Sequence, residues 1–141
     1  MVLFLMMALM ASAQDLVVCS YNIRNSNRGD DKNGNGWKTR YEYLCQQIEF
    51  EDPGLFGCQE VKKEQLDDMV ARMPEYAYVG VGRDDGKEGG EYSPVFYKKD
   101  RYVLLESGTF WLAEDPTKPV LGWDAACKRV CSWGHFRDKK T

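Results

Sequence analysis

A strand followed by a helix, twice in succession, is the feature of the sequence that most constrains the fold. Residues 15–24 (DLVVCSYNIR) are rich in Val and Tyr, which favour strands. A polar Asn/Asp/Gly loop at 25–36 separates them from a helix that opens at Trp37, in which apolar residues recur with helical spacing. A second strand at 54–61 (GLFGCQEV) then precedes a second helix at 62–73. This alternation is typical of an α/β fold.

The character of the sequence changes after Pro74, where strand-like runs are separated by Gly, Asp and Lys turns. Turns of this kind are typical of antiparallel pairing. We therefore expect a mixed β-sheet with helices on its outer face. The strand-like runs are YAYVGVG at 76–82, EYSPVFYKKD at 91–100, RYVLLESGTFWL at 101–112 and KRVCSWGHFRDKK at 128–140.

The size and charge of the chain limit what it can be. Its 141 residues suffice for one domain with a core, and 43% hydrophobic and 13% aromatic residues indicate a globular rather than a disordered chain. The formal net charge of -3 indicates a mildly acidic surface. A phosphate or nucleic-acid ligand would therefore need local positive groups or a bound cation.

The N-terminal segment MVLFLMMALMASAQ has the features of an export signal. Its apolar run is too short to span a membrane and ends at the small-x-small pattern ASA, which is typical of a signal peptidase site. We expect a signal peptide at 1–13, export to the periplasm or the extracellular space, and a mature chain of 14–141 with no integral membrane segment. The segment lacks the Lys or Arg of a typical signal peptide, and a buried N-terminal helix is the alternative, because no polar face is present.

The five cysteines do not predict a zinc site. Their odd number leaves at least one thiol unpaired. Cys19, Cys45 and Cys58 fall in apolar runs, where cysteine usually acts as a small buried hydrophobe. Cys127 and Cys131 lie four residues apart and can pair or bind a metal, but no second Cys or His pair has suitable spacing for zinc.

Polar side chains near the ends of the predicted strands form a candidate site. Glu60 follows the apolar run of the second strand, at the rim where ligands of α/β sheets usually bind. Mg2+ takes oxygen ligands, commonly one or two carboxylates with phosphate oxygens. Glu60 can supply such a carboxylate, and Asn22 an amide donor to a phosphate oxygen. Arg83 can add a planar cationic clamp. Glu91 is the fourth polar residue of this candidate site.

The loop at 31–42 matches the spacing of a calcium-binding loop, D-x-[DN]-x-[DN]-G-x5-E, and offers an alternative function. Under this alternative the chain is a non-catalytic secreted module. A strand rather than a helix precedes the loop, and Lys38 occupies a position where an aliphatic residue is expected, so calcium is disfavoured. The matching residues are Asp31, Asn33, Asn35, Gly36 and Glu42.

Several segments taken together resemble the endonuclease/exonuclease/phosphatase superfamily, whose fold is DNase I-like. The resemblance covers nearly all of residues 15–141. It implies a four-layer α/β sandwich, of which this chain would be the N-terminal half, truncated at its C-terminus. The segments are SYNIR at 20–24, Trp37-x-x-Arg40, GLFGCQEV at 54–61, YVGVGRDDG at 78–86, GEYSPVFYKKD at 90–100 and CSWGHFRDKKT at 131–141.

The resemblance implies a metal-dependent phosphoesterase that hydrolyses phosphodiesters or phosphomonoesters of nucleic acids, lipids or small molecules. Glu60 would be the metal ligand, and Asn22 would help to hold the metal and the phosphate. Glu91 resembles the acidic residue that orients the catalytic histidine, and Arg83 matches a basic position near the substrate. The implied cofactor is Mg2+ or another divalent cation such as Mn2+ or Ca2+.

The remaining family motifs, a histidine in an N-T-H-x-D-like strand, a G-D-x-N pair and a closing S-D-H, do not occur in the chain. The lone His135 lies outside such a motif, and we interpret it as structural. We therefore expect an incomplete, inactive fragment whose partner is the missing C-terminal half, and which exposes one face of its first strand. That face carries either Leu16 and Val18 or the alternate residues Val17, Cys19 and Tyr21.

Overall fold

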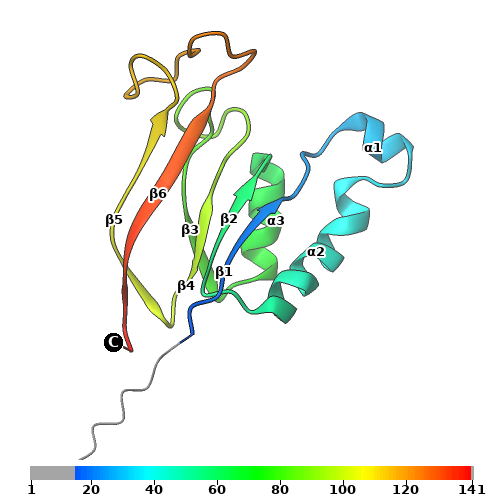
Figure 1. Cartoon of the computed structure of the whole chain (residues 1–141). Coiled ribbons are helices and arrows are strands. Elements are labelled where there is room, and N and C mark those ends of the chain that lie inside the picture. The colour runs from blue at the N-terminus through cyan, green and yellow to red at the C-terminus, as the bar shows by residue number, and fades with distance from the viewer. Residues whose placement is uncertain (1–14, 141) are drawn as a thin grey trace, which may run out of the picture.

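The computed structural model describes residues 15–140, so the predicted signal peptide lies outside the described residues. None of the helices in this part of the chain combines the length and apolar character needed to cross a membrane. Figure 1 shows a sheet with helices on one face and a long hairpin on the other. In chain order the elements are β1 (Val18–Asn22), α1 (Arg28–Lys32), α2 (Trp37–Glu51), β2 (Leu55–Gln59), α3 (Lys63–Arg72), β3 (Tyr76–Val79), β4 (Val95–Lys98), β5 (Tyr102–Trp111) and β6 (Val130–Asp138).

The main sheet has the strand order β1-β2-β4-β3. Strands β1 and β2 pair in parallel, with Asn22 opposite Gln59 at their carboxyl ends. Strand β4 pairs antiparallel with both β2 and β3, so the sheet is mixed. Strands β5 and β6 form a separate antiparallel hairpin that contacts β3 and β4. The predicted α/β fold class, with a mixed sheet and helices on one face, is confirmed.

The core forms between the main sheet and helices α2 and α3, because each of these elements presents an apolar face. Side chains alternate along β2, and Phe56 and Cys58 are buried in the same cluster as the helix residues. Phe56 stacks on Phe96 of β4 with 4.7 Å between ring centroids and meets Tyr76 edge-on at 5.1 Å. The helices contribute the buried residues Trp37, Leu44, Cys45 and Ile48 from α2, and Leu66 and Met69 from α3.

All five cysteines are free thiols. Cys45 and Cys58 are 0% and 1% exposed, and burial raises their pKa to about 11 and about 12. These two are small core residues, as predicted, and Cys19 packs against the same core from β1. Within residues 15–140 no cluster of three or more metal-ligating side chains includes Cys127 or Cys131.

The segment predicted as a loop at 25–36 contains a short helix, α1, so the prediction of a continuous loop was wrong. Asn27 caps this helix, because its side-chain oxygen accepts a hydrogen bond from the backbone amide of Asp30 at 2.9 Å. Arg24 donates to both carboxylate oxygens of Asp30, at 2.5 and 2.8 Å, and thereby lowers the pKa of Asp30 to about 2. The Asn and Asp residues that predicted turns thus act as a helix cap and an ion-pair partner.

The glutamate that would close a calcium loop at 31–42 is engaged by another helix. Glu42, which would close the loop, accepts a hydrogen bond from Arg72 of α3 at 3.1 Å. No group of three or more acidic, His or Cys side chains that could hold a metal ion occurs among the residues that the structure describes. The closing glutamate therefore belongs to an ion pair between α2 and α3.

Gly80 determines how closely the hairpin approaches the main sheet. Its φ of 128° lies in a region that side chains rarely adopt, and a Cβ atom there would lie 2.8 Å from Ser132 Oγ of β6 and 3.2 Å from Pro94 Cα. Farther along the hairpin, Phe136 of β6 packs on Tyr97 of β4 with 5.0 Å between ring centroids. The hairpin is therefore fixed against the sheet at two places.

Strand β1 exposes one face. Leu16 and Val18 are 56% and 60% exposed, whereas Cys19 and Tyr21 pack against the core. Within the strand the exposed face is therefore the one that carries Val18, although Val17, which precedes β1, is 42% exposed as well. Among residues 15–140, strand β1 pairs with β2 alone, so its other edge is open in this part of the chain. Exposed apolar side chains on an open edge strand promote association.

We expect Gly80→Ala to lower the free energy of unfolding by about 2–4 kcal/mol, because the methyl group adds a clash to an unfavourable φ. Gly34→Ala is the matched control, since Gly34 also has a positive φ, of 74°, but has open space around it. Urea unfolding followed by circular dichroism measures both. Equal losses in the two variants would show that the close approach at Gly80 does not constrain the hairpin.

We expect residues 14–141 to self-associate through β1, and the double substitution Leu16→Thr/Val18→Thr to shift the distribution towards monomer. Threonine keeps the strand preference of this segment while it removes apolar surface. Sedimentation velocity over a range of concentrations measures the change. Tyr43→Gln, at a residue of α2 that is 72% exposed, is the control and should leave association unaltered. A wild-type chain that stays monomeric at all concentrations would contradict the prediction.

Candidate functional site

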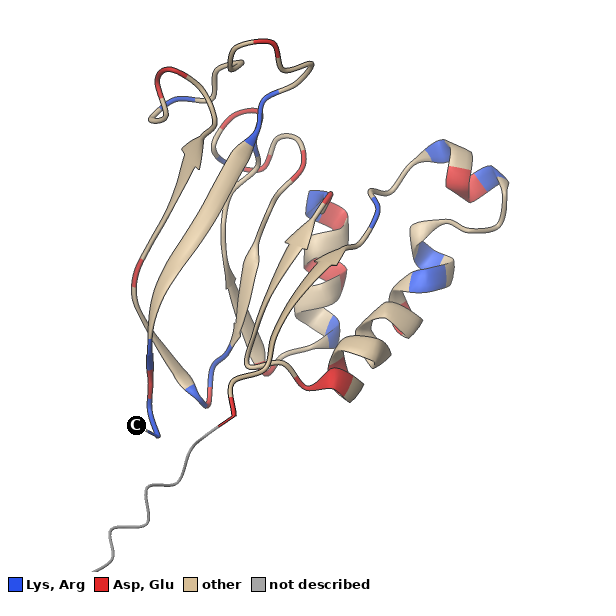
Figure 2. Cartoon of the chain, viewed as in Figure 1, with Lys and Arg blue, Asp and Glu red and all other residues tan. Residues whose placement is uncertain are grey.

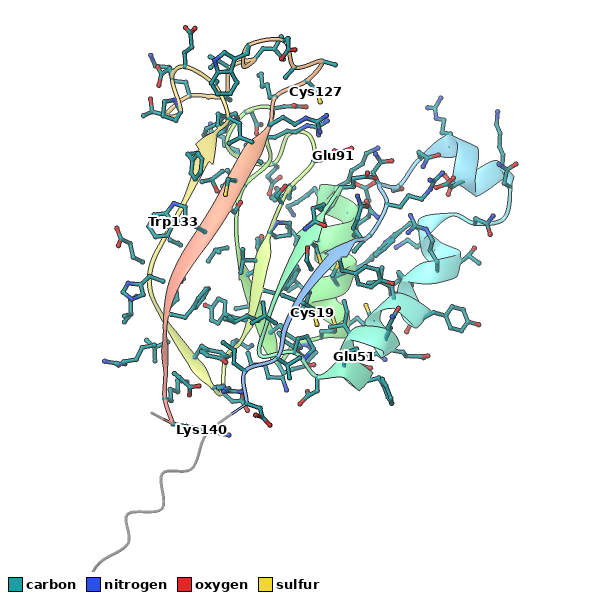
Figure 3. All side chains as sticks on the ribbon, viewed as in Figure 1. Cys19, Glu51, Glu91, Cys127, Trp133 and Lys140 are labelled. Atoms are coloured by element: carbon teal, nitrogen blue, oxygen red, sulfur yellow. The ribbon has the colours of Figure 1, made fainter. Side chains whose placement is uncertain are left out.

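A cavity of about 190 Å3 lies at the carboxyl ends of β1 and β2, where the loop between β3 and β4 and the start of β6 also meet. All four residues singled out from the sequence line it. Figure 3 shows Glu91 near one end of the main sheet, with Lys140 at the opposite end. The lining residues are Asn22, Gln59, Glu60, Arg83, Glu91, Tyr92, Ser93, Arg129 and Val130.

Glu60 occupies a left-handed backbone conformation at the point where β2 stops. Its φ is 61°, which is uncommon for a residue with a side chain and costs about 1–2 kcal/mol. The chain then resumes pairing at once, because Val61 and Tyr92 exchange backbone hydrogen bonds, with 2.7 Å from the Tyr92 amide to the Val61 carbonyl. This bridge holds the turn that carries the Glu60 carboxylate.

Two hydrogen bonds hold the Glu60 carboxylate. Asn22 donates from its side-chain amide to one oxygen at 3.0 Å, and the backbone amide of Asn25 donates to the other at 3.1 Å. The Asn22 bond, followed by the Asn25 bond, lowers the pKa of Glu60. Glu60 is therefore an anion at neutral pH, as a ligand of a hard cation has to be.

Asn25 joins Glu60 to Glu91, and sequence analysis missed it. Its side-chain amide donates to Glu91 at 2.7 Å, while its backbone amide binds Glu60. The residue lies in the segment that was interpreted as a loop of turn-forming residues. The only signal for it was its position directly after the SYNIR strand that carries Asn22.

Arg83 forms a fixed ion pair with Glu91. Its Nη1 atom donates to the Glu91 carboxylate at 2.5 Å, and the two side chains are only 18% and 17% exposed. The Nε atom of Arg83 is buried and has no hydrogen-bond partner among the residues that the structure describes. The backbone amide of Arg83 donates to the carbonyl of Glu91 at 3.1 Å, so the loop that holds both is closed on itself. Arg83 thus neutralises Glu91, and its predicted contact with substrate stays a prediction.

Gln65 and Arg40 hold the chain where it leaves β1. Gln65 is fully buried, accepts a hydrogen bond from the amide of Ser26 at 2.9 Å and donates to the carbonyl of Arg24 at 3.1 Å. Arg40 donates to the same Arg24 carbonyl at 2.7 Å and also to the carbonyl of Ile23. These contacts give a structural reason for the Trp-x-x-Arg spacing at the start of α2, because Arg40 reaches back to the end of the strand.

The donor set of the cavity fits a hard cation rather than zinc. Among the described residues it brings two carboxylates together, those of Glu60 and Glu91, with no histidine or cysteine. Each Glu60 oxygen accepts one hydrogen bond and keeps a second lone pair for a ligand. Mg2+ keeps several waters and commonly takes only one or two protein carboxylates. His135 is exposed on β6 opposite Glu106 and does not line the cavity.

Comparison with known proteins agrees with the fold. No family model matches the chain. An endonuclease/exonuclease/phosphatase family protein from Bacteroides thetaiotaomicron is 49% identical, with a TM-score of 0.88, over 89% of this chain and 46% of that one. A second such family protein, from Bacteroides vulgatus, is 46% identical, with a TM-score of 0.82, over 86% of this chain and 46% of that one. The resemblance to the endonuclease/exonuclease/phosphatase superfamily is confirmed.

A third solved structure of this superfamily fold carries a named activity. It is the mannosyl-6-phosphatase of Bacteroides thetaiotaomicron, which is 49% identical, with a TM-score of 0.89, over 90% of this chain and 48% of that one. The chain spans less than half the length of each of these three superfamily structures. An activity of a whole superfamily protein is therefore only proposed for this chain.

We expect Asn22→Ala to raise the pKa of Glu60 towards its ordinary value of 4.5, because the largest cause of the lowering is removed. Carbon-13 NMR of the glutamate carboxyl groups measures this pKa, with Asn35→Ala as a control. Since the folded-state pKa is lowered, the stabilisation that it provides is present above about pH 4.5 and is lost as the pH falls through the folded-state value. An unaltered Glu60 pKa in Asn22→Ala would show that this hydrogen bond is not maintained in solution.

Proposed function

We propose that the chain forms the metal- and phosphate-binding part of a metal-dependent phosphoesterase. The observation that carries this proposal is the charged Glu60 carboxylate, held by Asn22 and Asn25 at a cavity on the carboxyl ends of two parallel strands. Ligands of α/β proteins usually bind at this rim. The identity to superfamily proteins, including a phosphatase, supports the same assignment.

In this proposal Glu60 and Asn22 hold Mg2+, or another divalent cation such as Mn2+ or Ca2+. When bound, the cation would neutralise negative charge on the phosphoryl group. Asn22 is fixed by its bond to Glu60, and its oxygen accepts a hydrogen bond from the backbone amide of Arg24 at 2.9 Å. Both ligands are thus oriented before a cation arrives, which lowers the cost of binding.

Glu91 acts as a positioning residue in the proposed mechanism. Its carboxylate already accepts hydrogen bonds from Asn25 and Arg83. The resemblance assigns it to orient a catalytic histidine, and His135 lies outside the cavity. We assign that histidine to the part of the superfamily proteins that the match does not cover, which would act as the partner of this chain. The chain by itself is then inactive.

The substrate that we propose is a small phosphate ester rather than polymeric nucleic acid. The net charge of the chain is -3. A mildly acidic surface does not favour a polyanion. Because the chain is similar to a mannosyl-6-phosphatase, a sugar phosphate is the first candidate substrate. We further propose export to the periplasm or the extracellular space, on the strength of the signal-like segment at 1–13.

We expect Glu60→Gln to weaken Mn2+ binding by roughly 10-fold or more, because the charge that holds the cation is lost while the shape is kept. Electron paramagnetic resonance of free Mn2+ measures this in the purified chain, and a thermal melt checks the fold. Glu75→Gln is the matched control, since Glu75 is exposed and lies just before β3, at the opposite end of the sheet.

The same substitution should lower kcat by several orders of magnitude in the full-length phosphoesterase. The 141-residue chain alone should give no Mg2+-dependent turnover of a generic phosphoester. Mn2+ binding that is equal in wild type, Glu60→Gln and Glu75→Gln would remove Glu60 from the metal site. Turnover by the chain alone, above the Glu60→Gln background, would contradict the assignment of the catalytic base to another segment.

A further inference from the structure

We propose that Arg129 binds the phosphoryl group in this cavity and gives it a preference for phosphomonoesters over phosphodiesters. The proposal rests on the proposed phosphoesterase function and names the substrate class of the same site. Neither the composition nor the motifs of the sequence drew attention to Arg129. The structure places it among the residues that line the cavity with Glu60 and Glu91.

The backbone of Arg129 is held in place at the start of β6. Its carbonyl accepts a hydrogen bond from the amide of Leu112 at 2.9 Å, which continues the pairing of the hairpin by one residue. Three residues along, Ser132 lies close to Gly80, directly after β3, where a Cβ on Gly80 would be 2.8 Å from Ser132 Oγ. Arg129 therefore approaches the cavity from the hairpin, on the side opposite the helices. Figure 2 shows basic residues at the start of β6 beside the acidic loop between β3 and β4.

Arg129 is available to a ligand, whereas the other cations near the cavity are engaged. Its side chain is exposed and makes no hydrogen bond or ion pair with any residue in 15–140. Arg83, the other basic residue of the lining, is paired with Glu91 and largely buried. Lys128, the neighbour of Arg129, donates to the backbone carbonyl of Asp84 at 2.6 Å. Arg129 is thus the free guanidinium of the cavity lining.

The charges of the cavity favour a doubly charged ligand once a cation is bound. Arg83 and Glu91 cancel each other, so Glu60 and Arg129 carry the remaining unpaired charges of the lining. These two also cancel, and a divalent cation then leaves two positive charges in excess. A phosphomonoester dianion matches that excess, whereas a phosphodiester carries a single negative charge.

The shape of the guanidinium points to the same selectivity. Arginine binds phosphate best through two parallel N–H donors on two oxygens. A phosphodiester has two non-bridging oxygens, and a cation at Glu60 would take one of them. A phosphomonoester has three, so two stay free for the paired donors of Arg129. The monoester can therefore satisfy the cation and the guanidinium together.

The test measures binding to the purified chain with Mg2+ by NMR titration, with inorganic phosphate and dimethyl phosphate as probes. Wild type should bind phosphate more tightly than dimethyl phosphate. Arg129→Gln should weaken phosphate binding by about 10- to 100-fold and should reduce the preference over dimethyl phosphate. Arg129→Lys keeps the charge but loses the paired donors, so its phosphate affinity should lie between those of wild type and Arg129→Gln.

Arg137→Gln is the matched control, because Arg137 is an exposed arginine at the far end of the same strand. It should bind both probes as wild type does. Phosphate affinity that is equal in wild type and Arg129→Gln, or a wild type that binds no phosphate, would overturn the proposal. An equal loss for both probes in Arg129→Gln would overturn the selectivity.

Failure of the metal site can be told apart from failure of this proposal. Arg129→Gln should keep the Mn2+ affinity of wild type, because Arg129 is not a metal ligand. Normal Mn2+ binding with phosphate binding that does not depend on Arg129 rejects the role of Arg129 and leaves the phosphoesterase proposal standing. The opposite result is that Glu60 binds no Mn2+ while Arg129→Gln still abolishes phosphate binding. It rejects the metal-dependent phosphoesterase and keeps Arg129 as an anion-binding residue.

Discussion

The parallel pairing of β1 and β2 is the constraint on which the rest of the site depends. It places Asn22 opposite Gln59, so that the Asn22 side chain meets the Glu60 carboxylate across the ends of two strands. A shift in register by one residue would turn Asn22 to the other face of the sheet. It would also turn Cys19 and Tyr21, which pack against the core, to the exposed face. The packing of the core and the geometry of the site therefore fix the same register.

The polar network at the strand ends offsets the cost of holding the chain in an unfavourable shape. Arg24 and Glu60 both have positive φ, of 57° and 61°, although neither is glycine. Each is held by long-range contacts, Arg24 through Gln65 and Arg40 and Glu60 through Asn22 and Asn25. Strain of this kind persists only where surrounding bonds determine the conformation, and it is concentrated at functional sites. The cavity is thus built on backbone that the core and the network hold together.

Residues whose roles follow from local pattern could be predicted from the sequence, whereas residues whose roles need distant partners could not. Asn22 and Glu60 stood out because each ends a strand, and the register of the sheet then brings them together. Asn25 reaches Glu91, 66 residues away, and nothing in its neighbours indicates that contact. Arg129 reaches the cavity only because the hairpin crosses the second face of the sheet. Helix α1 was missed because its cap and ion pair use residue types that also form turns.

The two sides of the cavity belong to different layers of the molecule. Glu60 comes from the main sheet, while Arg129 comes from the hairpin that meets that sheet at Gly80. An anion held by a cation at Glu60 and by Arg129 would add a link between these layers to the side-chain packing and to the hydrogen bonds that Trp111 and Lys128 donate to the loop between β3 and β4. A bound phosphate would then also restrict motion of the hairpin relative to the sheet. Rigidity of the hairpin would in this way report the state of the site.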